Sequence, residues 1–193
     1  MSIVIVFGAL PLLGYLFHVE TLYRPIASGP ATHPSTAIAT CIIAIAIVLL
    51  HRAVFKQVAI FLITLAVFIL SFELLDKFYN NQQGALFFKD IIKEDLLNGK
   101  MNSIGTNTIV MLLFLCLSIF TSFAGRGTLS QTLAFFSGLI ASISFIGYMY
   151  GVSEFFGQMS IVSAMVGGVM SLGILLSNHS HDPLRAITSP HAS

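Results

Sequence analysis

The sequence predicts an all-α integral membrane protein, with six transmembrane helices arranged as three helical hairpins and an interfacial helix between helices 3 and 4. Three observations support this fold class. Only 9% of the 193 residues are charged and the mean hydropathy is +0.91, whereas soluble domains carry about 25% charged residues. The apolar residues gather in runs that are long enough to cross a bilayer. Short patterns recur where these runs begin and end, which indicates an internal repeat.

The apolar runs are expected to form helices, in chain order, at about 2–18, 34–50, 54–72, 103–124, 128–150 and 159–178. Together they make a transmembrane domain over residues 1–178, followed by a cytoplasmic tail over residues 179–193. The first run lacks the basic start and the cleavage site of a signal peptide, so we interpret it as a membrane helix. Because lipid offers backbone groups no hydrogen-bond partner, each run must satisfy its own backbone as an α-helix.

The long joint between the third and fourth runs contains ALFFKDIIKEDLL. A helix here would place Phe88, Ile91, Ile92 and Leu96 on one face and the charged residues elsewhere. This pattern is typical of an interfacial helix on the outer surface. An amphipathic lid packed on the bundle, or a simple loop, are the alternatives.

Basic residues in the short joints predict the orientation. Arg52, Lys56 and Arg126 follow the second and fourth runs, Arg185 lies in the tail, and Asp182 is the one acid in these segments. Basic, acid-poor joints favour the cytoplasmic side, so both termini are expected in the cytoplasm of a multi-pass protein of the inner membrane. The net charge of +1 makes nucleic acid an unexpected partner.

The starts of the even-numbered runs share a pattern in which one residue is followed, four and five positions later, by two small residues. The three copies are Thr32 with Thr36 and Ala37, Met101 with Gly105 and Thr106, and Met159 with Ser163 and Ala164. The odd-numbered runs end with a small residue before an aromatic one, at Gly14–Tyr15, Ser71–Phe72 and Gly147–Tyr148. The chain therefore reads as three helical hairpins.

The small residues at these starts continue into the helices at a spacing of four, as Thr36, Thr40 and Ala44 and as Ser163, Gly167 and Ser171. In lipid, small side chains let helix backbones approach each other closely. We interpret the two stripes as packing seams, with a ligand groove along them as the alternative.

These helix starts, the Gly-Tyr helix ends and the outer loop before Met101 resemble the multi-pass membrane sensor module that precedes bacterial histidine kinase, diguanylate cyclase or PAS domains. In that family the helix starts read Met-x-x-x-Thr-Ala. This chain departs from the pattern, since Thr32 replaces the Met and Gly105–Thr106 moves the threonine by one position. Glu73 falls where the family often has an acid at the end of its third helix.

The resemblance implies a sensory input module of a signal-transduction or two-component system. No output domain follows within the 193 residues. We therefore expect either a piece of a longer signalling protein or a stand-alone relative that works with a separate partner.

Polar groups near a membrane are costly and are candidates for function. Glu73, Glu154, His18 and His33 are expected to form the rim of an outward-facing cavity for a small or lipophilic ligand, with Tyr15 and Tyr148 below it. The alternative is that these side chains are solvated at the interface or cap helix ends.

No arrangement of residues typical of catalysis is found, so an enzyme is not expected. His18 and His33 lack a third ligand for a metal, and His33 and His51 lie at opposite ends of one helix, which argues against haem. Cys41 and Cys116 are interpreted as small apolar residues. No cofactor is predicted.

The predicted function is a membrane-embedded sensory module that relays a signal to a cytoplasmic output domain or to a protein partner. A non-catalytic structural subunit of a larger membrane complex is the alternative. A transporter is less favoured, because the apolar runs hold essentially no deep charge. Homo-oligomerisation stays open.

Overall fold

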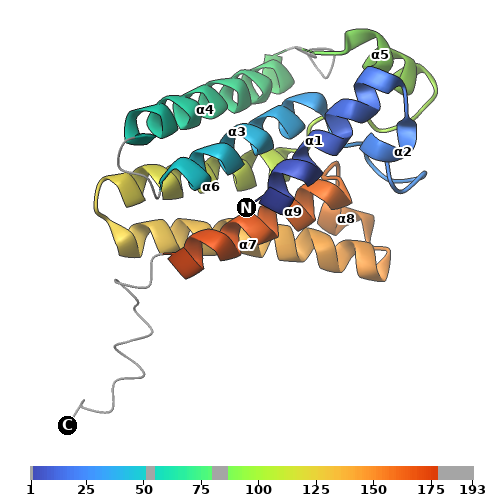
Figure 1. Ribbon diagram of the computed structural model, residues 1–193. Helices are drawn as coiled ribbons and strands as arrows, with labels where there is room; N and C mark the ends of the chain where they lie inside the picture. The colour runs from blue at the N-terminus through green and yellow to red at the C-terminus, as the bar shows by residue number, and fades with distance from the viewer. Residues whose placement is uncertain (1, 51–54, 80–86, 178–193) are drawn as a thin grey trace.

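A computed structural model describes residues 2–50, 55–79 and 87–177 of the chain (Figure 1). These residues form helices and loops, and no strand occurs among them. The predicted tail over residues 179–193 lies outside the described residues. So do His51, Arg52, Asp182 and Arg185, and with them much of the basis for the predicted orientation.

Six helices of the described chain are long and apolar. They are α1 (Ser2–Phe17), α3 (Pro34–Leu50), α4 (Lys56–Tyr79), α6 (Thr106–Phe123), α7 (Gly127–Tyr150) and α9 (Ile161–Ser177). Of these, α4, α6 and α7 are long and apolar enough to cross a membrane, while α1, α3 and α9 are shorter apolar helices. Large apolar side chains stand exposed on the outside, including Phe61 and Phe68 on α4 at 66% and 69%. Such a surface fits contact with a lipid bilayer better than contact with water.

Three shorter helices gather at one end of the bundle, on the right in Figure 1. These are α2 (Glu20–Tyr23), α5 (Lys89–Leu97) and α8 (Ser153–Phe156). They lie in the connections from α1 to α3, from α4 to α6 and from α7 to α9. We call this end of the molecule the loop end.

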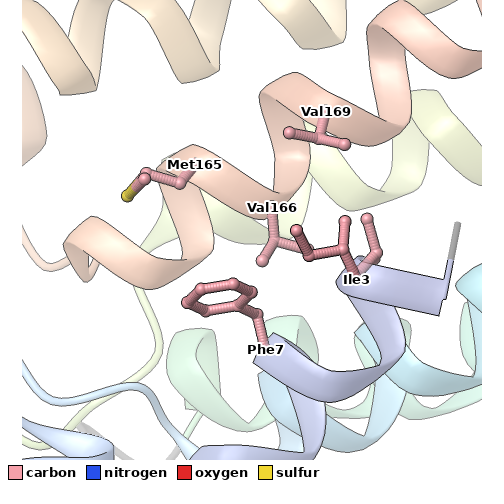
Figure 2. A pocket seen from close by; sticks show the side chains of 6 residues that line it. Ile3, Phe7, Met165, Val166 and Val169 are labelled. Carbon is pink, nitrogen blue, oxygen red and sulfur yellow. The ribbon is translucent and has the colours of Figure 1, made fainter.

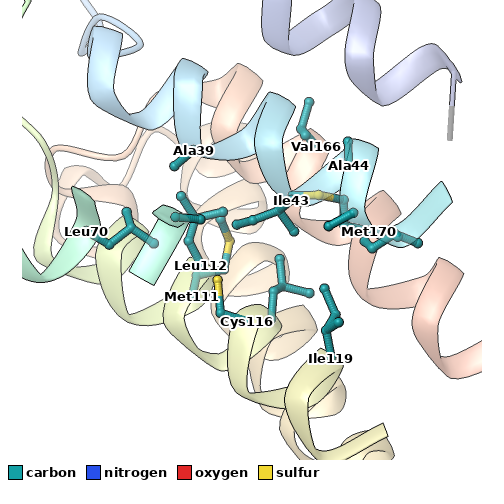
Figure 3. Close-up of a cluster of buried hydrophobic side chains, with 14 of the residues drawn as sticks. Ala39, Ile43, Ala44, Leu70, Met111, Leu112, Cys116, Ile119, Val166 and Met170 are labelled. Atoms are coloured by element: carbon teal, nitrogen blue, oxygen red, sulfur yellow. The ribbon is translucent and has the colours of Figure 1, made fainter. Parts of the chain in front are cut away.

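The second, fourth and sixth of the six long helices, which are α3, α6 and α9, form the centre of the bundle. Each of α3, α6 and α9 contacts the other two. On the outside, α1 packs against α3 and α9, α4 against α3 and α6, and α7 against α6 and α9. The core between them is built from aliphatic and sulfur-containing side chains, among them Ile43, Leu112 and Met170 (Figure 3). Dispersion contacts of this kind hold helices together in lipid, where burial gives no hydrophobic gain.

α4 runs to Tyr79 instead of ending near residue 72. The reason is that the polar residues beyond Phe72 find partners inside the bundle. Glu73 accepts a hydrogen bond from the Ser35 hydroxyl, and the Lys77 ammonium donates to the Ile104 carbonyl at 2.8 Å. The helix therefore continues past the first charged residue, and Glu73 lies within it.

The predicted alignment of the middle helix start is wrong by three residues. α6 begins at Thr106, so that Gly105 is its N-cap, whereas Thr36 and Ser163 are the third residues of α3 and α9. Thr108, which is buried, takes the equivalent place in α6, and Thr106 is exposed. The physical cause is the extended backbone of Gly105 (φ −70°, ψ 137°), which delays the start of the helix.

The amphipathic segment of the long joint forms α5, which packs on the bundle. Ile92 and Asp95 are buried, and the Phe88 ring stacks on Tyr15 with centroids 5.3 Å apart. Leu96, expected on the same apolar face, is 39% exposed. The helix is thus a lid that closes part of the loop end, as the first alternative proposed.

Candidate functional site

The chain makes a tight corner where α1 ends. The backbone N–H of Val19 donates to the Gly14 carbonyl at 2.8 Å, and His18 has a positive φ of 55°. This is the Schellman arrangement, in which the residue after the helix takes the left-handed conformation. The corner brings Tyr15 and Tyr23 into a stack, with ring centroids 4.3 Å apart.

A matching corner occurs where α7 ends. The Val152 N–H donates to the Gly147 carbonyl at 2.9 Å, Gly151 has a φ of 68°, and Tyr148 stacks on Phe156 at 4.1 Å. The repeated Gly-Tyr pattern in the sequence therefore corresponds to the same local structure at both ends of the chain.

Each corner tyrosine also bonds to the start of the following helix. The Tyr148 hydroxyl donates to the Met159 carbonyl at 2.6 Å. The Tyr15 hydroxyl lies 3.2 Å from the Thr32 carbonyl and 3.0 Å from Asn102 Oδ1, and can donate its one proton to either. These bonds account for both tyrosines as structural residues.

Arg24 is buried at the loop end, with 3% of its surface exposed. Its guanidinium donates to Asp95 Oδ2 at 2.8 Å and to the carbonyls of Gly29 and Met101 at 2.8 and 2.9 Å. A buried charge is tolerable only when it is paired and hydrogen-bonded, and this arginine meets both conditions. We call α1 and α3 the first helix pair, α4 and α6 the second, and α7 and α9 the third. Arg24 fastens the connection within the first pair to the lid helix α5.

Further polar contacts extend this fastening. The Asn102 amide donates to Asp95 at 2.6 Å, which links the lid to the segment before α6. At the surface, the Lys100 ammonium lies 2.7 Å from a Glu20 carboxylate oxygen, and this hydrogen bond lowers the pKa of Glu20.

Hydroxyl groups join the first and third helix pairs. Thr32 Oγ1 and Ser160 Oγ lie 2.7 Å apart, and Ser160 Oγ lies 2.9 Å from Ser163 Oγ. The Ser163 N–H also donates to Ser160 Oγ at 3.1 Å, which satisfies a free donor at the start of α9. All three side chains are buried.

Glu73 is the buried acid of α4, with 2% of its surface exposed. It accepts a hydrogen bond from the hydroxyl of Ser35, at the start of α3. A carboxylic group inside an apolar helix is expensive to keep and is a candidate for function by default.

His33, directly before α3, is 4% exposed, and its Nδ1 atom is buried without a hydrogen-bond partner among the described residues. Burial lowers the pKa of His33 to about 4. The imidazole is therefore neutral near pH 7, and a free ring nitrogen can bind a polar group that enters the bundle.

We call the polar residues that meet at the loop end the polar collar. Its members are Tyr15, Arg24, Thr32, His33, Ser35, Glu73, Lys77, Asp95, Asn102 and Ser160.

The six predicted ligand residues fall into different environments. Glu73, His33 and Tyr15 are buried in the collar, and Tyr148 is half-buried at its own corner. His18 and Glu154 are exposed. Within the described residues, no hydrogen bond or ion pair joins any two of the six, so the rim stays a prediction that these contacts do not support.

The predicted packing residues lie mostly at helix contacts. Thr36, Ala37, Ser163 and Ala164 are buried. A Cβ on Gly105 would lie 3.0 Å from the Met159 backbone nitrogen, so this glycine permits close approach of two connections. A Cβ on Gly167 would collide with the Met111 side chain, and Thr106 is the one that is exposed.

Arg24, Asp95 and Asn102 were not among the predicted site residues. One signal could have pointed to Arg24: when the two Gly-Tyr corners are superposed by sequence, Arg24 stands opposite Gly157. A charge in one copy of a repeat opposite glycine in the other marks a position whose contacts differ between the two copies.

Two grooves lie on the flanks of the bundle, away from the collar. One, of about 140 Å³, lies between α1 and α9 (Figure 2). The other, of about 320 Å³, lies between α7 and α9 and is lined in part by the small residues Gly138, Ser142, Gly168 and Ser171. Neither is lined by any of the six predicted ligand residues.

Comparisons with protein families, with curated proteins and with solved structures found no match to this chain. The collar and the grooves are therefore interpreted from their own chemistry.

Proposed function

We propose that the chain is a membrane-embedded sensory input module that relays a signal to a cytoplasmic output domain or partner. The observation that carries the proposal is Glu73, a buried acid that accepts a hydrogen bond from the neutral hydroxyl of Ser35. A membrane helix that serves only to pack against its neighbours does not need a buried carboxylic acid. A buried acid whose hydrogen bonding can change gives the helix bundle two arrangements with different energies.

In this proposal all six long helices cross the inner membrane as three pairs, with the collar outside and both termini in the cytoplasm. The repeated corners of α1 and α7 support the pairing. The 16 residues of α1 rise about 24 Å, less than a hydrocarbon core of about 30 Å, and local thinning of the bilayer compensates for such a difference. A reporter that fluoresces only in the cytoplasm, fused to the C-terminus, tests the orientation; a dark fusion of the folded protein contradicts it.

A chimera tests the sensory role. The full chain is joined to the cytoplasmic part of a histidine kinase, reconstituted in lipid, and assayed for autophosphorylation. Glu73→Gln keeps the size and the Ser35 hydrogen bond but removes the acid. Allosteric couplings of 1–3 kcal/mol change an output by about 5- to 150-fold, so a change of about fivefold or more is expected.

Glu94→Gln is the matched control, because Glu94 is an exposed acid at the same end of the molecule, on α5, and is not among the predicted ligand residues. It is expected to leave the output unchanged. If both folded variants give the wild-type output, the sensory role is wrong.

The groove between α7 and α9 favours a second candidate function, a non-catalytic structural subunit. Its small residues offer a surface on which a helix of a neighbouring subunit can pack closely. The protein is solubilised gently and the mass and composition of its complex are measured. A reproducible set of unrelated proteins in the complex supports the structural-subunit function, and a complex that contains copies of this chain alone contradicts it.

A further inference from the structure

The three helix pairs are fastened to one another unequally at the loop end. The first pair is joined to the second by ion pairs: Arg24 to Asp95 at 2.8 Å and Lys100 to Glu20 at 2.7 Å. The second is joined to the third by Lys77, whose ammonium donates to Gln158 Oε1 at 2.9 Å. Charge-assisted bonds such as these are about twice as strong as neutral ones.

Among the described residues, the contacts identified between the first and third pairs are made by neutral groups. Their collar contact is the hydroxyl pair of Thr32 and Ser160. The loss of one neutral hydrogen bond between groups that can find other partners is a smaller barrier than the separation of a buried ion pair.

The same seam is loosely packed along the helices. Between α1 and α9 lies the groove of about 140 Å³, whose exposed lining is entirely apolar (Figure 2). Val4 and Val166 are buried in it, but Phe7 and Met165 at its walls are 42% and 50% exposed. Lining atoms without a partner lose their dispersion contacts.

The bilayer lowers the cost of opening an apolar seam further. Lipid tails are as apolar as the side chains they would replace, so separating two apolar helix faces in lipid forfeits packing but no hydrophobic energy. Lipid tails cannot replace the charged partners that are lost when an ion-paired seam opens. In addition, short joints connect α3 to α4 and α6 to α7, whereas α1 and α9 lie at opposite ends of the chain and share no joint.

We propose that the bundle opens between α1 and α9, with the Thr32–Ser160 hydroxyl pair as the latch of this seam. The inference rests on the proposed sensory function, for which it names the moving part. Opening separates α9, the last described helix, from the first helix pair, while the ion pairs hold the first and second pairs together.

Distances between spin labels test the proposal on the full chain in lipid nanodiscs, in a background without Cys41 and Cys116. One label is placed at Leu16 on α1. The second is placed at Leu172 on α9 for the test pair, or at Leu97 on α5 for the control pair across the ion-paired seam. All three side chains are well exposed, at 61%, 59% and 79%, so that a label fits.

The test pair is expected to show two distance populations, and the control pair one. Thr32→Val, which keeps the shape but removes the hydroxyl, is expected to raise the longer population of the test pair at least twofold. Ser160→Ala tests the same latch from the other side. A single test-pair distance that neither variant changes would overturn the proposal.

The kinase chimera separates this inference from the proposed function. A single, unchanging test-pair distance together with an output that responds to Glu73→Gln removes the seam but keeps the sensory role. Two populations together with an unresponsive output keep the seam and remove the sensory role.

Discussion

Replacement of Gly147 by alanine is expected to destabilise the protein. A Cβ at this position would lie 2.6 Å from the Phe155 Cβ and 3.0 Å from the Val152 carbonyl oxygen. Both neighbours are fixed by the corner, since the Val152 N–H bonds back to the Gly147 carbonyl. Carbon atoms pack at about 3.5–4.0 Å, so the corner must move by about an ångström. Overpacking of this kind costs about 1–3 kcal/mol.

Gly168→Ala provides a matched control with the same chemical change. Gly168 lies within α9, and a Cβ there would lie 3.8 Å from Ala141 Cβ, which is ordinary van der Waals contact. Removing a glycine from a helix interior stabilises by about 0.5–1 kcal/mol. The two variants are therefore expected to shift stability in opposite directions.

Thermal unfolding in detergent, followed by a thiol-reactive dye, measures the difference. Cys116 is fully buried in the folded protein and is expected to react when the bundle unfolds. Cys41, a free cysteine that is partly exposed, is replaced by alanine in all variants so that it does not react with the dye. For a chain of this size, 1 kcal/mol moves the Tm by about 2–4 °C, so Gly147→Ala should lower it by about 2–12 °C. An unchanged Tm for Gly147→Ala, or a shift of both variants in the same direction, would refute the reasoning.

Three further predictions concern the loop end, and each is measured by the same unfolding assay. His18→Gly should stabilise by about 1 kcal/mol, because His18 holds a left-handed φ of 55° that glycine adopts freely; a lower Tm contradicts this. Asp95→Asn should cost about 1.5–3 kcal/mol, because it removes the buried carboxylate that pairs with Arg24 and leaves the partly exposed Glu20, 3.0 Å from Arg24 Nε, as the remaining carboxylate partner among the described residues; a loss under about 1 kcal/mol would mean that the pair does not fasten the lid. Burial lowers the pKa of His33 from 6.5 to about 4, so the unfolded state binds the proton more readily, and stability is lost as the pH falls below about 6.5. Linkage gives a loss of about 2–3 kcal/mol at pH 4.5, and the drop in Tm from pH 7 to 4.5 should be smaller in His33→Gln than in the wild type.

The sequence located the long helices because each depends on local composition. The runs predicted at 34–50 and 128–150 coincide with α3 and with nearly all of α7, since apolar character and the glycines and prolines between runs lie side by side in the chain. The Gly-Tyr corners were found as a pattern for the same reason.

The polar collar could not be read in this way, because its bonds join distant residues. Arg24 and Asp95 are 71 positions apart, and Ser35 and Glu73 are 38 apart. In the sequence, Arg24 is one basic residue in a loop and Glu73 is the end of an apolar run. Only the packing of the helices shows that the first is buried against a carboxylate and that the second lies inside the bundle.

A comparison of the two corners separates the residues that both corners share from those that occur in one corner alone. Some residues recur in both corners with the same role. Gly14 and Gly147 accept the hydrogen bond that closes the corner, and Tyr15 and Tyr148 stack on an aromatic ring. Arg24 has no counterpart, because Gly157 stands in its place.

This difference changes how strongly neighbouring helix pairs are joined. An arginine at the first corner fastens α5 to the first helix pair, while the glycine at the third corner offers no charge to the first helix pair. The ammonium that bonds to the third connection, at Gln158, belongs to Lys77 of α4. If the contacts between the three helix pairs were equally strong, no one of them would open in preference to the other two. In the opening that we propose, the missing charge makes the seam between α1 and α9 the weakest of the three, and this inequality would direct a signal to α9 in the proposed sensory module.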